Sequence, residues 1–235
     1  KLLLIPLVLI VSGILISSIV LKNYSPQNNG YSKVSEIHPI PITLQPKNTT
    51  PQALDVPWAD IKNWIKPEHN PILSPTEEWE DKNVLEPTVL FEDGVFKMWY
   101  CGGEKCALGF ATSQDGIHWD KYENNPIFGR GKGGEEGTVR QNNVLKHKGI
   151  YYLFYVTDSK DMYVATSKNG IEYKKYPKPI LSHDPDSWDI NMANNFQWVD
   201  SEGNWFMIYE SQYNDGYALW NMGLAYGDSP FKWYK

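Results

Sequence analysis

The chain has 235 residues and a net charge of −6, and its 10 Trp, 15 Tyr and 8 Phe make it rich in aromatic side chains. No cluster of Lys and Arg is dense enough to follow a phosphate backbone, so we expect no nucleic-acid partner. Aromatic side chains at this density are common in β-rich proteins that handle carbohydrates, because flat rings cover the apolar faces of sugars.

The N-terminal segment 1–22 predicts a transmembrane anchor or a signal segment. Residues 2–21 carry no charge and lie between Lys1 and Lys22, and a helix of that length spans roughly the 30 Å of a hydrocarbon core. No small-residue cleavage motif follows, which favours an uncleaved anchor over a cleaved signal peptide. We therefore expect a membrane-anchored, extracytoplasmic protein, or a secreted one if the segment is cleaved.

The segment 23–57 is rich in Pro, Ser and Asn and shows no apolar periodicity. This composition predicts an extended linker that holds the following domain away from the membrane. The predicted domain spans residues 58–235. It begins with the apolar spacing of a short amphipathic helix over residues 58–67.

From residue 70 onward the sequence repeats itself at offsets of 53 to 55 residues. Asn-Pro-Ile at Asn70 returns at Asn125, and Lys-Pro-Ile follows at Lys178. Within each unit, turn residues separate short apolar runs, and in the first unit these runs predict strands over residues 85–91, 95–101, 107–112 and 117–122. Four antiparallel strands per repeat predict an all-β fold of β-propeller blades, which we place at about residues 70–125, 126–178 and 179–235. Because propellers have about four to eight blades, we expect further blades outside this sequence.

The two cysteines, Cys101 and Cys106, flank a short loop that could bring their sulfur atoms face to face. An oxidising compartment would permit a disulfide there, and the sequence leaves paired and free thiols equally open. No His or Cys stands at zinc-like spacing, so we expect no metal site. No Gly-rich phosphate loop or dinucleotide fingerprint occurs, so we expect no cofactor.

Three stretches of the repeat resemble the five-bladed β-propeller glycosidases, the superfamily of glycoside hydrolase families 32, 43, 62, 68 and 130. They read EPTVLFEDGVFKMWYCGG, GFATSQDGIHWDKYENNPIF and YVATSKNGIEYKKYPKPIL. The resemblance covers residues 66–235. It implies hydrolysis of O-glycosyl bonds in an extracellular oligo- or polysaccharide, at a site in the mouth of the central channel. In that superfamily one acidic residue from each of the first three blades contributes, because the reaction needs a proton donor and an ionised carboxylate.

The acidic positions of that superfamily are only partly kept in this chain. Glu86 stands where the first blade usually has Asp, whereas Gln141 and Asn195 occupy the positions expected for acids in the second and third blades. Amides therefore replace two of the three expected carboxylates. This replacement favours a catalytically silent carbohydrate-binding propeller as the alternative to an enzyme.

The antiparallel order of a blade offers substitute carboxylates. The second strand ends at the rim where the first strand begins, and Asp158 and Glu210 stand at that end in the second and third units. We therefore expect Glu86, Glu210 and Asp158 to be catalytic, with Glu86 and Glu210 as the acid/base pair. The side chains expected to bind substrate are Arg140, Gln141, Asn142, Asn194, Asn195 and Trp188.

Overall fold

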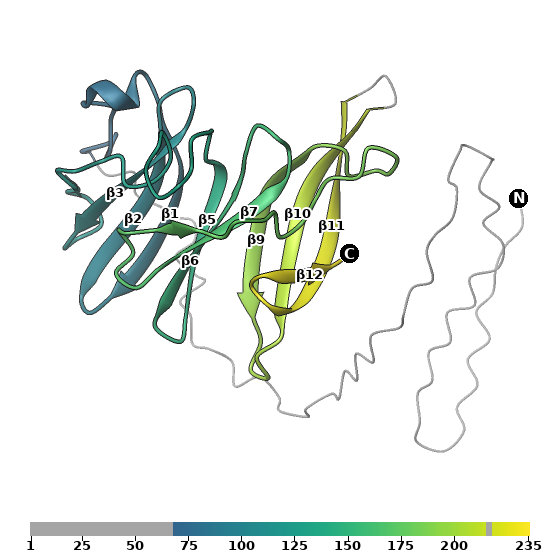
Figure 1. Cartoon of the computed structure of the whole chain (residues 1–235). Helices are drawn as coiled ribbons and strands as arrows, with labels where there is room; N and C mark the ends of the chain where they lie inside the picture. Colours follow the sequence, from purple (N-terminus) through teal and green to yellow (C-terminus); the bar gives the residue numbers. More distant parts are fainter. Residues whose placement is uncertain (1–67, 215–217) are drawn as a thin grey trace, which may run out of the picture. The chain divides into compact units, whose positions relative to one another are not determined.

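The computed structural model describes residues 68–214 and 218–235, which form three four-stranded antiparallel sheets (Figure 1). The first sheet contains β1 (Val84–Glu92), β2 (Val95–Gly102), β3 (Ala107–Ser113) and β4 (Asp120–Lys121). The second contains β5 (Arg140–His147), β6 (Ile150–Val156), β7 (Met162–Ser167) and β8 (Lys174–Lys175). The third contains β9 (Met192–Val199), β10 (Trp205–Asn214), β11 (Ala218–Ser229) and β12 (Lys232–Tyr234). A 3-10 turn, η2 (Glu78–Glu80), precedes β1.

The prediction of an all-β fold is confirmed, and each sheet falls inside one of the three predicted units. The sheets follow one another along the chain in the manner of propeller blades, and we call them blades one, two and three. Within residues 68–214 and 218–235, no helix has the length and apolar character needed to cross a membrane. The predicted anchor, the linker and the helix over residues 58–67 lie outside the described residues.

The hairpin turns follow from their residue types. The turn between β1 and β2 has positive φ at Asp93 and Gly94 (53° and 78°), and the turn between β5 and β6 repeats this at Lys148 and Gly149 (48° and 79°). Two central residues with positive φ match the right-handed twist of the flanking strands. The Asp-Gly signal therefore places the first hairpin correctly.

The fourth strand of blade one is shorter than predicted, because local bonds occupy the backbone before it. The Asp115 carboxylate accepts the N–H groups of Ile117 and His118 at 2.8 Å each. The Ser113 hydroxyl accepts the N–H of Gly116 at 2.8 Å. Side chains that bond neighbouring backbone groups compete with strand pairing, so residues 114–119 form a turn and the strand is confined to β4.

Aromatic side chains join neighbouring blades. The Trp99 indole of blade one is fully buried, lies 5.6 Å from the Tyr151 ring centroid, and donates its N–H to the Gly170 carbonyl of blade two at 2.7 Å. Between blades two and three, Phe154 packs against Trp205 and Trp233. The apolar core therefore lies between the sheets, as expected for blades that stack face to face.

Each blade also contains one buried carboxylate held by a tyrosine and a lysine, which we call the acid–Tyr–Lys triad. In every blade the tyrosine lies on the second strand, 20 residues after the acid, and donates its hydroxyl to it. The lysine comes from the fourth strand or directly after it, at 2.5–2.7 Å. The three triads are Glu80–Tyr100–Lys121, Glu135–Tyr155–Lys175 and Asp189–Tyr209–Lys235.

The triad of blade two offsets the cost of burying its acid. Burial acts to raise the pKa of Glu135, but hydrogen bonds from Lys175 and from the Gly137 N–H outweigh it, with a further one from Tyr155. The net pKa of Glu135 therefore lies below its ordinary value, and the side chain stays ionised although it is buried. A buried charge is tolerated when it is paired and hydrogen-bonded in this way.

Replacing Tyr155 by Phe is expected to destabilise the fold by about 1.5–3 kcal/mol, because it removes a hydrogen bond to a buried ionised group. Urea unfolding monitored by circular dichroism measures this change. Tyr163→Phe is the matched control, since the Tyr163 hydroxyl makes no hydrogen bond within the described residues, and we expect less than about 0.5 kcal/mol there. Equal losses in both variants would contradict the role of the triad.

Candidate active site

The first strand of each blade has a bulge near its start. In β1 the extra residues are Glu86 and Pro87, and in β5 they are Gln141 and Asn142. In β9 the extra residues are Ala193 and Asn194, and Asn195 is paired with Tyr209. Glu86 and Gln141 both have left-handed backbone conformations, with φ of 52° and 50°. Bulges of this kind redirect side chains and are common beside active sites.

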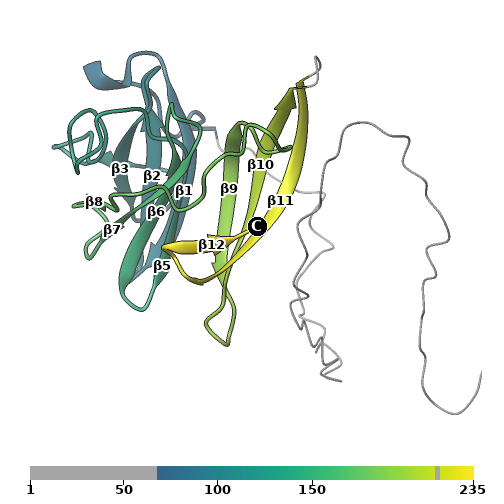
Figure 2. The same ribbon diagram turned by 45° about the vertical axis from the view of Figure 1, so that its right-hand side comes forward.

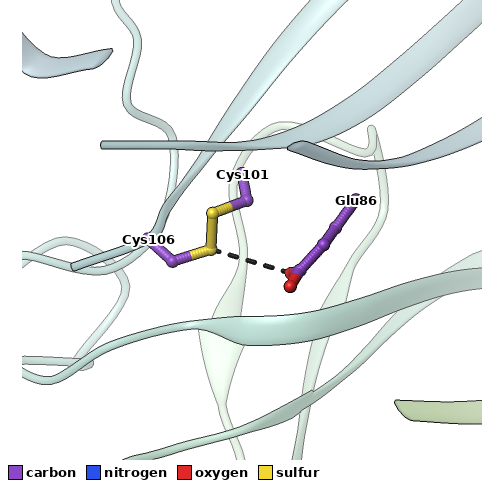
Figure 3. A group of neighbouring side chains, drawn as sticks. All are labelled: Glu86, Cys101 and Cys106. Carbon is purple, nitrogen blue, oxygen red and sulfur yellow. Dashed lines mark hydrogen bonds between the residues drawn. A yellow bond between two sulfur atoms is a disulfide. The ribbon is translucent and has the colours of Figure 1, made fainter. Parts of the chain in front are cut away.

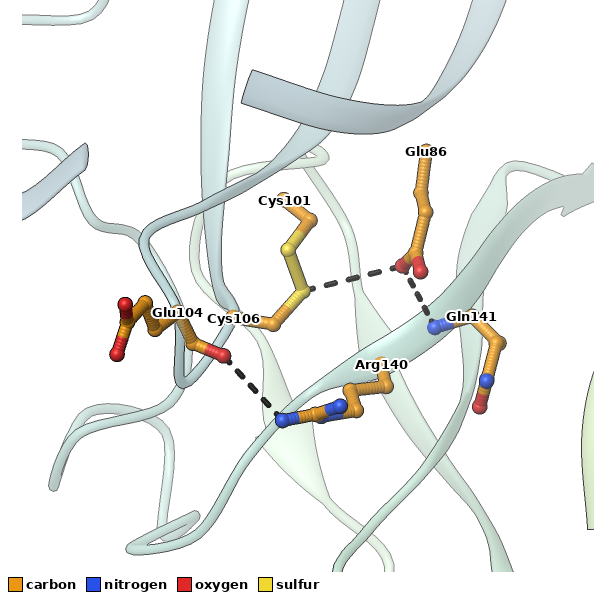
Figure 4. Close-up of a disulfide and its surroundings, with 6 residues drawn as sticks. All are labelled: Glu86, Cys101, Glu104, Cys106, Arg140 and Gln141. Atoms are coloured by element: carbon orange, nitrogen blue, oxygen red, sulfur yellow. Dashed lines mark hydrogen bonds between the residues drawn. A yellow bond between two sulfur atoms is a disulfide. The ribbon is translucent and has the colours of Figure 1, made fainter. Parts of the chain in front are cut away.

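The Glu86 carboxyl is half-buried where β1 meets β5 (Figures 3 and 4). Its Oε2 accepts the Gln141 backbone N–H at 2.7 Å and lies 3.8 Å from the Cys106 Sγ. Burial raises the pKa of Glu86, while the Gln141 N–H and the positive charge of Arg140 act against the rise without cancelling it. The carboxyl group therefore keeps its proton to a higher pH than an exposed glutamate does.

Cys101 and Cys106 form a disulfide beside this carboxyl group, which resolves the alternative that the sequence left open. One oxygen of Glu86 and the two sulfur atoms lie within 4.8 Å of one another. Because the sulfur atoms are bonded to each other, neither is available as a thiolate ligand. Arg140 contacts the loop that the disulfide closes. Its guanidinium donates a hydrogen bond to the Glu104 carbonyl at 3.2 Å (Figure 4).

A chain of hydrogen bonds connects the first strands of the three blades. The Gln141 N–H bonds Glu86, and the Gln141 carbonyl accepts the Asn195 amide at 2.8 Å. The side-chain oxygen of Asn195 accepts a hydrogen bond from the side-chain amide of Gln197 at 2.8 Å. The side-chain oxygen of Gln197 in turn accepts one from the side-chain amide of Asn143 at 2.8 Å. The three positions that the resemblance aligns, Glu86, Gln141 and Asn195, therefore lie in one continuous network.

Arg140, Gln141 and Asp158 line one cavity of about 310 Å³ at the edge of blades two and three. Lys160, Asn191 and Trp220 line the same cavity. The sequence did not point to these three residues. Lys160 lies in the turn between β6 and β7, Asn191 lies just before β9, and Trp220 lies on β11.

Glu210 and Asn194 lie apart from that cavity. The Glu210 carboxylate accepts the Asn194 amide at 2.9 Å, and both line a separate hollow with Asn195 and Phe196. Tyr209 is buried in the core between blades two and three. Since successive side chains of a strand point to opposite faces, Glu210 lies on the face of β10 opposite to Tyr209 and lines the separate hollow. The structure thus brings Asp158 into the cavity with Gln141, but not Glu210.

Two further predicted substrate-binding residues have distinct surroundings. Asn142 is 8% exposed, and neither polar atom of its side chain has a hydrogen-bond partner. Trp188 stacks on Tyr209, with ring centroids 5.6 Å apart, and lies directly over Gly223, where a Cβ would come within 2.6 Å of the indole. Trp188 is therefore packed against blade three, whereas Asn142 keeps unused hydrogen-bonding capacity beside Gln141.

The family of this chain follows from its match over residues 46–222 to the model of glycoside hydrolase family 130, described as β-1,4-mannooligosaccharide phosphorylase. The chain belongs to this family. The resemblance to the propeller glycosidase superfamily is thereby confirmed. Family 130 includes phosphorylases as well as glycosidases, so membership leaves open which of the two reactions applies.

Curated proteins are similar to this chain at low identity. A Mycobacterium tuberculosis protein described as uncharacterized is 26% identical over 78% of this chain and 62% of its own length. The 1,2-β-oligomannan phosphorylase of a Thermoanaerobacter species is 25% identical over 70% of this chain and 56% of its own length. The chain thus spans about three-fifths of the curated relatives it matches.

One solved structure has the same fold, with a TM-score of 0.52 and 19% identity over 72% of this chain and 56% of the other. It is described within the family of mannoside phosphorylases that contains glycoside hydrolases targeting β-1,2-mannosidic linkages in Candida mannan. At this level of identity the likeness concerns the fold alone.

The raised pKa of Glu86 predicts a pH-dependent effect of Glu86→Gln on stability. Because the ionised carboxylate is disfavoured in the folded chain, the wild type loses stability as pH rises above 4.5, the ordinary value for the group, towards its raised folded pKa. The free energy of unfolding of Glu86→Gln, relative to that of the wild type, should therefore be higher at about pH 7 than at about pH 4. Urea unfolding at both pH values measures the difference.

Glu123→Gln, at an exposed position after β4, gives the background effect of losing one carboxylate. A constant difference between Glu86→Gln and the wild type across this pH range would mean that Glu86 is not perturbed by its burial.

Proposed function

We propose that this protein cleaves a β-mannosidic bond in an oligosaccharide, with Glu86 as the proton donor. The observation that carries the proposal is the half-buried Glu86 carboxyl group, whose pKa is raised and whose position is fixed by the Gln141 N–H. A general acid must hold its proton near the working pH and deliver it from a fixed position. The mannoside is suggested by the described activities of the family and of the oligomannan phosphorylase relative.

The proposed step is phosphorolysis. Glu86 gives its proton to the glycosidic oxygen as the bond from that oxygen to the anomeric carbon breaks. An oxygen of hydrogen phosphate bonds to the anomeric carbon, and the proton of the phosphate returns to Glu86. The products are mannose 1-phosphate and an oligosaccharide one residue shorter.

The composition of the inner network favours phosphate over water as the attacking group. Hydrolysis needs a carboxylate that activates water or attacks the sugar itself, and the network offers amides at Gln141 and Asn195. Phosphate is already an anionic nucleophile and needs no base. One carboxyl group is then sufficient.

Hydrolysis is the second candidate, and Asp158 supports it. This carboxylate is exposed and lines the cavity that Gln141 also lines. If water is the attacking group, Asp158 is the base that would activate it.

We also propose that the domain works outside the cytoplasm. The uncharged segment 2–21 supports this assignment as an anchor or signal. The disulfide beside Glu86 supports it independently, because disulfides persist in oxidising compartments.

Incubating the full chain with β-1,4- or β-1,2-mannotriose, with and without inorganic phosphate, tests the reaction. We expect mannose 1-phosphate that depends on added phosphate, and a loss of kcat of about 10²–10⁴-fold in Glu86→Gln. Glu123→Gln is the control for a lost surface carboxylate and should keep full activity.

Each other outcome has a defined meaning. Free mannose that forms without phosphate and is lost in Asp158→Asn would establish hydrolysis. Full activity in Glu86→Gln would overturn the role of Glu86. Binding of mannotriose without any product would make the protein a carbohydrate-binding propeller, the alternative that the amides at Gln141 and Asn195 favour.

A further inference from the structure

The hairpin of β10 and β11 is longer than its counterparts in the other blades. Pairing between β9 and β10 ends at Ser211 and Met192, whereas pairing between β10 and β11 continues to Asn214 and Ala218. The hairpin therefore runs past the start of β9 (Figures 1 and 2). Trp220 lies on this projecting part, opposite Gln212.

Trp220 forms an aromatic wall of the cavity that Arg140 and Gln141 line. The residue is 54% exposed, so Trp220 is accessible to solvent and to a ligand. The remaining polar lining comes from Asp158, Lys160 and Asn191. A cavity of about 310 Å³ lies at the lower end of the range of roughly 300–1,000 Å³ typical of ligand sites.

Asn191 is held in place at the base of the hairpin. Its backbone N–H donates to the Ser211 hydroxyl at 3.2 Å, and its side-chain amide donates to Gln212 at 3.1 Å. Gln212 also donates its backbone N–H to the Asn191 carbonyl at 3.2 Å. The polar part of the cavity is thus fixed to the strand pair that carries Trp220.

We propose that this cavity is a saccharide-binding subsite and that Trp220 is its stacking platform. A pyranose ring has an apolar face, which an indole covers, and hydroxyl groups around its edge, which charged and amide side chains bind. The inference rests on the proposed function and extends it. Gln141 connects the subsite to the reaction, because it lines the cavity and its N–H holds the Glu86 carboxyl group.

The same lining fits a neutral sugar better than a phosphate ion. Asp158 places a carboxylate beside the cations Arg140 and Lys160, and a carboxylate repels an anion. The Arg140 guanidinium already donates to the Glu104 carbonyl. An indole face contributes nothing to anion binding, whereas it accounts for sugar stacking.

Met222 provides a control that distinguishes stacking by Trp220 from a general effect of losing an exposed apolar side chain. It lies on β11, two residues after Trp220 and on the same face of the strand, and is 74% exposed. Met222 lines the other hollow, with Glu210 and Asn194, and not the cavity. It is therefore the matched control for Trp220.

Isothermal titration of the full chain with β-1,4- and β-1,2-mannotriose tests the subsite. We expect saturable binding of one or both by the wild type, at least tenfold weaker binding by Trp220→Ala, and a smaller loss in Trp220→Phe, which keeps a ring. Met222→Ala should bind within about twofold of the wild type. Unfolding midpoints of all variants show whether each is folded.

Three results of the titration would overturn the inference. They are no binding of either mannotriose by the folded wild type, equal losses in Trp220→Ala and Met222→Ala, and displacement of bound mannotriose by inorganic phosphate that occupies the cavity. Glu86→Gln separates this inference from the proposed function. Retained binding in Glu86→Gln supports the subsite, whether or not the wild type turns over substrate. Normal turnover with an unchanged KM in Trp220→Ala would leave the proposed function intact and remove the subsite.

Discussion

A buried charge in each blade must be balanced, and this constraint organises the rest of the structure. An ionised carboxylate without partners is far too costly to bury, so Glu80, Glu135 and Asp189 are each tied to a tyrosine and a lysine. Each triad joins the segment before the first strand to the second strand and to the end of the blade. The start of every first strand is thereby fixed, and the candidate site is built at these starts.

Because their starts are fixed, the first strands of the three blades contact one another there. Glu86, Gln141 and Asn195 come from three blades and share one hydrogen-bonded network. Within it, Glu86 is the half-buried member that carries a carboxyl group, and its surroundings favour the protonated form. The neighbouring amides of Gln141 and Asn195 are consistent with the proposed reaction, in which the attacking group is an anion and needs no carboxylate to activate it.

Much of the fold could be predicted from the sequence, because turn residues interrupt each apolar run at strand length. The triads were missed although a signal existed: an acid lies 20 residues before Tyr100, Tyr155 and Tyr209 alike. The site was harder to predict. Which face of β10 carries the Glu210 side chain depends on the alternation of side chains along that strand. Trp220 lines the cavity because the β10–β11 hairpin is extended, and the other two blades have no such extension.

The shared backbone of Glu86 and Gln141 has an evolutionary consequence. Both residues adopt nearly the same left-handed conformation at the same place in their blades, yet one side chain is an acid and the other an amide. The backbone conformation therefore sets where the side chain lies but not whether that side chain is an acid or an amide. A single nucleotide change converts a glutamate codon into a glutamine codon, so an acid at such a position can be exchanged for an amide while the backbone keeps its conformation.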